Sequence, residues 1–104
     1  MGLKKNEALQ IARAYAVRVR TELDADAEIY LFGSAARDEM QEDSDIDVAV
    51  VSGIFNDDVV ENRVKLMLIS NIVSYDIEPH PVLREDWIAV TPFTREIKNE
   101  GILI

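Results

Sequence analysis

The chain has no cysteine, and it has a single histidine among its 104 residues. The lack of cysteine excludes disulfide frameworks, thiolate nucleophiles and cysteine-ligated metal sites. No run of residues approaches the ~18 consecutive apolar residues of a transmembrane helix, and the first ten, MGLKKNEALQ, lack the apolar core of a signal peptide. We therefore expect a cytoplasmic protein that does not associate with membranes.

Positive charge is also scarce, because 11 Lys and Arg face 20 Asp and Glu, for a formal net charge of −9 at pH 7. Such a surface repels a phosphate backbone, so we expect no direct binding to nucleic acid. A highly charged small molecule can still bind where metal ions neutralise the local acids. The 48% hydrophobic content argues against disorder, and the length predicts one domain over residues 1–104.

Apolar periodicity and turn residues predict helices and strands that alternate along the chain, which is typical of an α/β domain. Strands are expected at residues 28–32 and 46–52 and within the stretch VSYDIEPHPVL. Helices are expected at residues 3–23, at 35–39 with Ser34 as cap, after the caps Asn56, Asp57 and Asp58, and in TPFTREIKNE with Gly101 past its end. REDW is expected to begin a short helix or a turn.

Two of these elements carry a more specific prediction. For the helix that follows Asp58, the spacing of apolar residues predicts a buried face made of Val60, Val64, Met67, Leu68 and Ile72. In the last strand, the two prolines of the EPHPV segment stand two residues apart and remove hydrogen-bond donors on the same lateral side. This strand should therefore lie at an edge of the sheet or carry a bulge.

Acidic side chains are concentrated in one ten-residue segment, which holds Asp38, Glu39, Glu42, Asp43, Asp45 and Asp47. Asp45 and Asp47 alternate with apolar residues, so they should share one face of a strand while Ile46 and Val48 enter the core. Two neighbouring carboxylates repel each other unless a cation lies between them, and Mg²⁺ takes carboxylate and phosphate oxygens as ligands. This pair is expected to hold a metal, whereas the other four acids are typical of a solvated loop.

A glycine and a serine follow the strand that precedes the acidic segment. Gly33 allows the backbone to approach a bulky anion closely, and the first turn of the next helix offers free N–H groups to phosphate. Ser34 adds a hydroxyl, and Arg37 either adds a cation or pairs with neighbouring acids. Phosphate donors and metal ligands on consecutive strands together predict a metal-dependent nucleotide site.

The segment GSAARDEMQEDSDID reads as Gly-Ser, ten residues, then Asp-x-Asp. It resembles the signature of the DNA polymerase beta-like nucleotidyltransferases, and the small size resembles the minimal nucleotidyltransferases, which are often encoded beside a HEPN-domain ribonuclease toxin. The resemblance implies a polymerase beta palm-like fold, a small mixed sheet flanked by helices. One departure is Asp38, where many relatives have a second glycine.

The resemblance also implies roles for individual residues. Asp45 and Asp47 would hold two magnesium ions against the triphosphate of ATP, and Gly33, Ser34, Arg37 and Ser44 would contact the nucleotide and its phosphates. A third carboxylate would come from a later strand: Glu78, or alternatively Asp76, which shares a face with Glu78 and His80. An acceptor hydroxyl would then attack the α-phosphorus, and pyrophosphate would leave. His80 is expected to be a surface or partly packed residue rather than a general base.

Because 104 residues leave no room for an acceptor-binding domain, a second protein chain should present the acceptor. The resemblance implies a HEPN-type toxin, with AMP transferred to a toxin tyrosine and this chain acting as the antitoxin in a homo- or hetero-oligomer. Two alternatives remain open. The chain could be a non-catalytic acidic module that neutralises a basic partner by occlusion, or a nucleotide sensor that binds ATP without transferring it.

Overall fold

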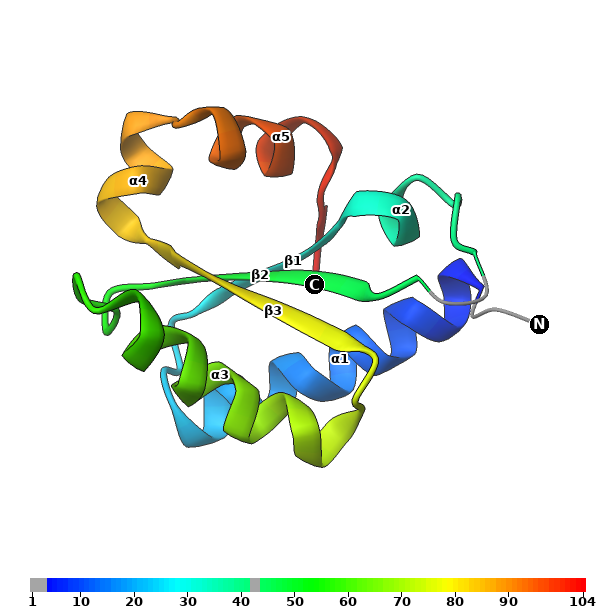
Figure 1. Cartoon of the computed structure of the whole chain (residues 1–104), viewed down its shortest axis with the longest axis horizontal. Helices are drawn as coiled ribbons and strands as arrows, with labels where there is room; N and C mark the ends of the chain where they lie inside the picture. Colours follow the sequence, from blue (N-terminus) through cyan, green and yellow to red (C-terminus); the bar gives the residue numbers. More distant parts are fainter. Residues whose placement is uncertain (1–3, 42–43) are drawn as a thin grey trace.

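The computed structural model describes residues 4–41 and 44–104 (Figure 1). Leu3 at the start of the first predicted helix, and Glu42 and Asp43 of the acidic segment, lie outside the described residues. The elements follow one another as α1 (Lys5–Glu22), β1 (Glu28–Phe32), α2 (Gly33–Ala36), β2 (Ile46–Ser52), α3 (Val59–Val73), β3 (Ile77–Leu83), α4 (Arg84–Ala89), α5 (Pro92–Glu100) and β4 (Ile102–Leu103).

The strands form one mixed sheet in the order β3-β2-β1-β4. β1 pairs antiparallel with β2 and with β4, whereas β2 and β3 run parallel. Helices α1 and α3 lie on one side of this sheet and α4 and α5 on the other (Figure 1). The predicted α/β class, a small mixed sheet flanked by helices, is confirmed. Among the described helices, none combines the length and the apolar character that a membrane crossing requires.

The two faces of β2 have different neighbours, because alternate side chains of a strand point to opposite sides. Ile46, Val48 and Val50 are fully buried in the larger core, which α1 and α3 cover. Ala49 and Val51 belong to a smaller core with Ile97 of α5. Asp47 shares the face of this smaller core, so β2 presents its carboxylate on the side of α4 and α5.

β3 lies at an edge of the sheet, as its prolines predict. Pro79 and Pro81 pair in register with Val48 and Val50 of β2. A proline has no N–H to donate, which an edge strand tolerates because its outer side needs no partner strand. The two prolines therefore help to keep a further strand from adding at this edge.

The prediction for the helix after Asp58 was right about its cap but wrong about its buried face. Asp58 caps α3 by accepting a hydrogen bond from the Glu61 backbone N–H at 2.9 Å. The residues that α3 buries are Asn62, Leu66, Ile69 and Ser70. The residues predicted to be buried are instead exposed, namely Val60, Val64, Met67, Leu68 and Ile72.

Hydrogen bonds explain why α3 turns a partly polar face inward. The Asn62 amide donates to the backbone carbonyl of Asn56 at 2.6 Å and accepts from the Asn56 N–H at 3.2 Å. The Tyr15 hydroxyl of α1 donates to the Leu66 carbonyl at 3.2 Å. Because buried polar groups with partners carry little penalty, this face can pack as well as the apolar one.

Two further predictions need correction. The helix expected at residues 35–39 is the single turn α2 at Gly33–Ala36, and Ser34 lies inside it rather than capping it. The last apolar residues, which carried no strand prediction, form β4 beside β1. Arg20 of α1 holds the end of the chain there, since its guanidinium donates to the Ile104 carbonyl at 3.0 Å.

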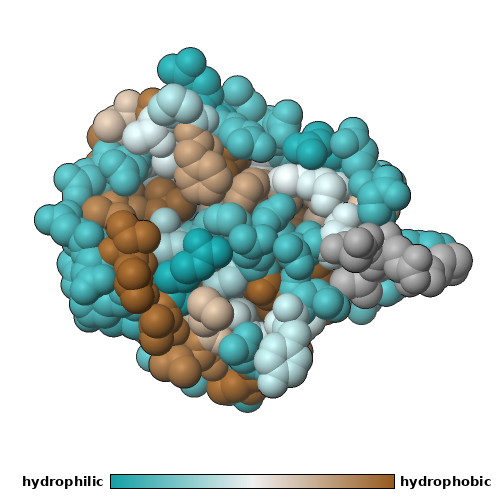
Figure 2. Space-filling view, viewed as in Figure 1, coloured by the Kyte–Doolittle hydropathy of each residue, from teal (hydrophilic) through white to brown (hydrophobic). Residues whose placement is uncertain are grey.

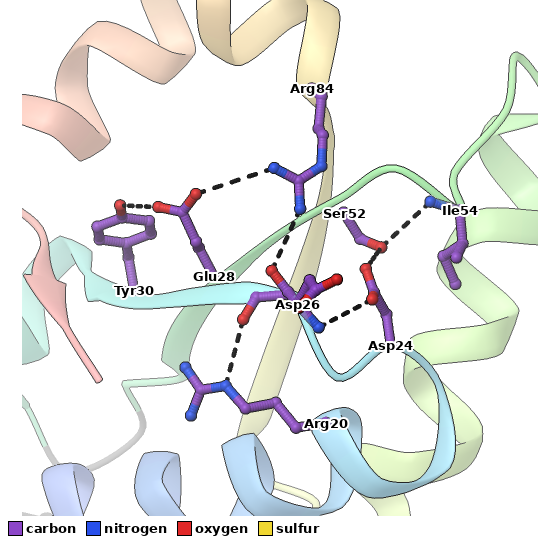
Figure 3. Close-up of polar contacts among 9 residues, drawn as sticks. Arg20, Asp24, Asp26, Glu28, Tyr30, Ser52, Ile54 and Arg84 are labelled. Carbon is purple, nitrogen blue, oxygen red and sulfur yellow. Dashed lines mark hydrogen bonds and ion pairs between the residues drawn. The ribbon is translucent and has the colours of Figure 1, made fainter.

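A polar network lies at the end of the sheet where β1 begins and β2 ends (Figure 3). The Ser52 hydroxyl donates to Asp24 Oδ2 at 2.5 Å and accepts from the Ile54 N–H at 3.2 Å. The Ser52 hydroxyl, and next the Asp26 backbone N–H, hold the pKa of the Asp24 carboxyl below its usual value. The network thus ties the loop after α1 to the end of β2.

This network predicts a pH-dependent contribution to stability. A carboxyl whose pKa is lower in the folded state stabilises the fold above its unfolded-state pKa, and this contribution disappears as the pH falls through the folded-state pKa. Ser52→Ala should therefore cost about 1–2 kcal/mol at pH 7 and less in acid, measured by urea unfolding. Ser70→Ala is the control, because this buried hydroxyl donates to the Met67 carbonyl and its loss should not depend on acid pH. An equal pH profile for both variants would contradict the assignment.

Candidate active site

Three adjacent strands bring sequence-distant residues together at one end of the sheet. Phe32, the last residue of β1, pairs in register with Asp47 near the start of β2, and Asp47 pairs in turn with Glu78 near the start of β3. Gly33 follows Phe32 directly. A glycine and two carboxylates therefore lie side by side although 45 positions separate Gly33 from Glu78.

The backbone at Gly33 lies directly against the Asp47 carboxylate. A Cβ atom at this position would lie 2.5 Å from Asp47 Oδ2 and 3.3 Å from Asp47 Cγ. Gly33 also has a φ of +71°, in the left-handed region where residues with a Cβ are strained. Both the contact and the backbone conformation thus require glycine at this position.

Asp47, Glu78 and His80 each offer one ligand atom within 4.8 Å of the others. His80 Nε2 lies 3.1 Å from Asp47 Oδ1, at hydrogen-bonding distance. The imidazole is held by edge contacts with Phe32, at 5.1 Å between ring centroids, and by Phe93 of α5 at 5.8 Å. All three polar side chains are partly buried.

A cation already lies beside Glu78. Arg63 of α3 donates from Nη2 to Glu78 Oε1 at 3.3 Å, and both side chains are partly exposed. Since Glu78 and Asp47 are register partners with the same charge, the Arg63 guanidinium beside Glu78 relieves part of their repulsion. One cation from α3 therefore lies at this pair of acids.

Asp45 and Glu78 share the rim of a pocket of about 290 Å³ at the free edge of β3. Arg63, Met67, Ser70 and Asn71 of α3 form one wall of the pocket, and Tyr75, Ile77 and Pro79 form the rest. Asp45 is exposed and stands just before β2, and the group of potential ligands found among residues 4–41 and 44–104 does not include it. The pocket therefore connects the acids at the sheet end to the surface of α3.

The other residues expected at the site lie near it with partners of their own. Arg37 forms ion pairs of 3.1 Å with both Glu39 and Glu100, and these contacts raise its pKa above the usual value. The Ser44 hydroxyl accepts from the Gln41 N–H at 2.8 Å. Asp76 is exposed in the turn before β3, where its carbonyl accepts from the Ile46 N–H at 2.8 Å. Of the two candidate third acids, Glu78 is the one that lies beside Asp47.

The contacts of two side chains at this site were not predicted from the sequence. His80 is partly packed, within the range that the sequence predicted, but its contact with Asp47 was not predicted. Arg63 carried no prediction, and it pairs with Glu78. The alternation of Glu78 and His80 along β3 was a usable signal for His80, because both had to share one face. For Arg63 the sequence holds no comparable signal, since its position depends on the rotation of α3.

The possible metal ligands at this site differ in the ions that they suit. Asp47 and Glu78 offer carboxylate oxygens within 4.8 Å of each other, whereas Asp45 lies just before β2 and outside this group. Mg²⁺ is bound in proteins by one or two carboxylates together with substrate phosphates and water. The Asp47 and Glu78 carboxylates fit this pattern, whereas the His80 nitrogen is a ligand more typical of transition metals.

Solved structures share the fold of this chain, and one family model matches its sequence. A crystal structure assigned to a nucleotidyltransferase from Sulfolobus solfataricus superimposes with a TM-score of 0.66 at 22% identity, over 99% of this chain and 87% of that one. Two mutant structures of the toxin–antitoxin complex MntA-HpeT superimpose at 22% identity with TM-scores of 0.58 and 0.56, over 98% and 97% of this chain and 72% of theirs. Among curated proteins, none matches the sequence. The family model for the nucleotidyltransferase domain matches residues 14–104, so the chain belongs to the nucleotidyltransferase domain family.

Proposed function

We propose that this nucleotidyltransferase domain transfers a nucleotidyl group, AMP from ATP, to a hydroxyl group on a partner protein. The observation that carries the proposal is the meeting of Gly33, Asp47 and Glu78 at the ends of three adjacent strands. The backbone at Gly33 passes close to the Asp47 carboxylate, and the Glu78 carboxylate lies beside Asp47. This arrangement can place a triphosphate next to an acceptor group. A fold used only for binding would not require this arrangement.

Each residue has a defined task in this proposal. Asp45, Asp47 and Glu78 would hold magnesium, which supplies charge stabilisation to the attacking and leaving oxygens of an in-line displacement. Gly33 and Ser34 would border the triphosphate, and Arg37 and Ser44 would contact it after giving up their present partners. Glu78 accepts the proton of the attacking hydroxyl, the new oxygen–phosphorus bond forms, and the bond to pyrophosphate breaks. His80 orients the Asp47 carboxylate through its Nε2 contact.

We further propose that the acceptor protein is a HEPN-type toxin and that this chain acts as its antitoxin in the cytoplasm. The structural similarity to the MntA-HpeT toxin–antitoxin complexes supports a partner of this kind. The formal charge of −9 also suits a basic partner, because opposite charges accelerate association. Candidate partners are proteins encoded by genes adjacent to the gene for this chain.

The test is transfer of label from α-labelled ATP, with magnesium, to the protein encoded by the adjacent gene. Transfer of label to this protein supports the proposal, and its absence with wild-type chain contradicts it. A complex that forms equally well with and without magnesium, and never becomes labelled, would favour neutralisation by occlusion. Binding of ATP without any release of pyrophosphate would favour a nucleotide sensor.

The same assay identifies the third carboxylate. Glu78→Gln should reduce transfer at least about 10²-fold, in the range that loss of a positioned acid or base produces. Asp76→Asn is the matched control, since Asp76 lies two residues away and outside the group formed with Asp47. It should keep transfer within about twofold of wild type. A larger loss with Asp76→Asn than with Glu78→Gln would assign the third carboxylate to Asp76 instead.

A further inference from the structure

The outer face of α3 carries a continuous row of exposed apolar side chains. Figure 2 shows this apolar band along the edge of the molecule that α3 occupies in Figure 1. The residues of this apolar stripe are Val59, Val60, Val64, Met67, Leu68, Ile72 and Tyr75. Val60 is 72% exposed, Leu68 67% and Tyr75 85%. Contiguous exposed apolar patches are typical of protein interaction sites, unlike apolar residues scattered singly.

The stripe is continuous with the candidate active site. Met67 and Tyr75 belong to the stripe and also line the pocket whose rim carries Asp45 and Glu78. A protein segment that lay along α3 could therefore place one of its side chains in the pocket. No side chain of the stripe is needed for the core, because α3 packs through its opposite face.

The strand order places this pocket on one particular side of the reacting centre. β2, with Asp47, lies between β1 and β3, so Gly33 after β1 and the pocket at the free edge of β3 lie on opposite sides of Asp47. In an in-line displacement the attacking and leaving oxygens lie on opposite sides of the phosphorus. If pyrophosphate leaves on the Gly33 side, the attacking hydroxyl enters from the pocket.

Charge distinguishes between the possible occupants of the stripe. Its N-terminal end is bordered by exposed Asp57, Asp58 and Glu61, and Asp76 stands at its C-terminal end. A second copy of a chain with a formal charge of −9 would meet repulsion. A partner with an apolar segment flanked by Lys or Arg would complement both the stripe and its acidic ends.

From these observations we propose that the apolar stripe of α3 is the docking surface for the acceptor protein, which lays an apolar, cation-flanked segment along α3 and directs its acceptor hydroxyl into the pocket beside Glu78. This inference rests on the proposed function and adds to it the surface where the partner binds. It also explains why α3 exposes its more apolar face.

The experiment uses Leu68→Glu and Ile72→Glu, with Ile88→Glu of α4 as a matched control. Ile88 is 78% exposed, so the control adds the same charge to an equally accessible apolar site outside the stripe. Binding of the protein encoded by the adjacent gene is measured by titration calorimetry, and label transfer is measured over a range of its concentrations. Calorimetry with ATP alone checks that the nucleotide site is intact in each variant.

We expect both stripe variants to raise the Kd and the KM for the acceptor at least about tenfold, as loss of a central interface residue does. The kcat and the ATP affinity should be retained, and Ile88→Glu should stay within about twofold of wild type. Three results would each contradict the docking surface. The first is wild-type affinity for the partner in both stripe variants, and the second is the absence of a complex with the wild-type chain. The third is a wild-type homodimer, seen in sedimentation, that Leu68→Glu dissociates.

The outcomes also separate this inference from the proposed function. If the stripe variants transfer label with an unchanged KM for the acceptor, the proposed transferase activity stands and the proposed docking surface is contradicted. If complex formation depends on Leu68 and Ile72 but the partner never becomes labelled, the docking surface is supported and the proposed transfer reaction is contradicted.

Discussion

Asp47→Asn should reduce nucleotidyl transfer by at least about 10³-fold while leaving the fold intact. Asp47 is the central member of the site, because its register partners are Phe32, directly before Gly33, on one side and Glu78 on the other. The amide has the same shape as the carboxylate, but it carries no charge and is a weaker ligand for magnesium. Loss of several kcal/mol of charge stabilisation in the transition state corresponds to this fall in rate.

The thermal stability of the Asp47→Asn variant should rise or stay unchanged, although its transfer rate falls. Asn keeps an oxygen that His80 can contact, and the substitution removes one of two like charges that lie side by side. The melting temperature of Asp47→Asn should therefore equal or exceed that of wild type. Asp38→Asn is the control, since this residue of the same acidic segment has a φ of 58°, a conformation that Asn adopts readily. Comparable loss of transfer in both variants would show that the acidic segment acts only through its total charge.

Gly33→Ala should lower transfer by about 10²-fold, the order of effect that a displacement of about 1 Å has on a catalytic group. The added Cβ would stand 2.5 Å from Asp47 Oδ2, which is far inside van der Waals contact, so the carboxylate or the strand end must shift. The left-handed φ of +71° adds strain for any residue with a Cβ. This strain should destabilise the fold by about 1–2 kcal/mol in urea unfolding.

Gly53→Ala provides the comparison for this variant. A Cβ at Gly53 would meet the Arg84 side chain at 3.4 Å, and Gly53 has no positive φ. We expect its transfer rate to stay within about twofold of wild type and its stability within about 0.5 kcal/mol. If Gly33→Ala retained full activity, the close approach of the Gly33 backbone to Asp47 would have no part in catalysis.

Local patterns in the sequence predicted the elements that form the site. The alternation of Asp45, Ile46, Asp47 and Val48 predicted which side of β2 is buried, because the side-chain period of a strand is fixed by covalent geometry. The two prolines of β3 predicted an edge strand for the same kind of local reason, a missing hydrogen-bond donor. The Gly-Ser and Asp-x-Asp spacing indicated the family to which the chain belongs.

The prediction failed where a choice depended on distant parts of the chain. α3 has two faces that can each pack, and hydrogen bonds from Asn56 and Tyr15 favour the face with Asn62 over the more apolar one. β4 is only two residues long, and it forms because β1 offers an unpaired edge beside it. Neither effect is visible in a window of the sequence around α3 or β4.

By itself, the sequence determined the α/β class, the strand that carries Asp47, and the glycine that precedes the acidic segment, since each depends on interactions within a few residues. Only the tertiary structure decided that Glu78 rather than Asp76 lies beside Asp47, that Arg63 pairs with Glu78 and His80 contacts Asp47, and that α3 exposes its apolar face. The physical reason is that register between β2 and β3 and rotation of α3 are fixed by contacts between residues far apart in the chain.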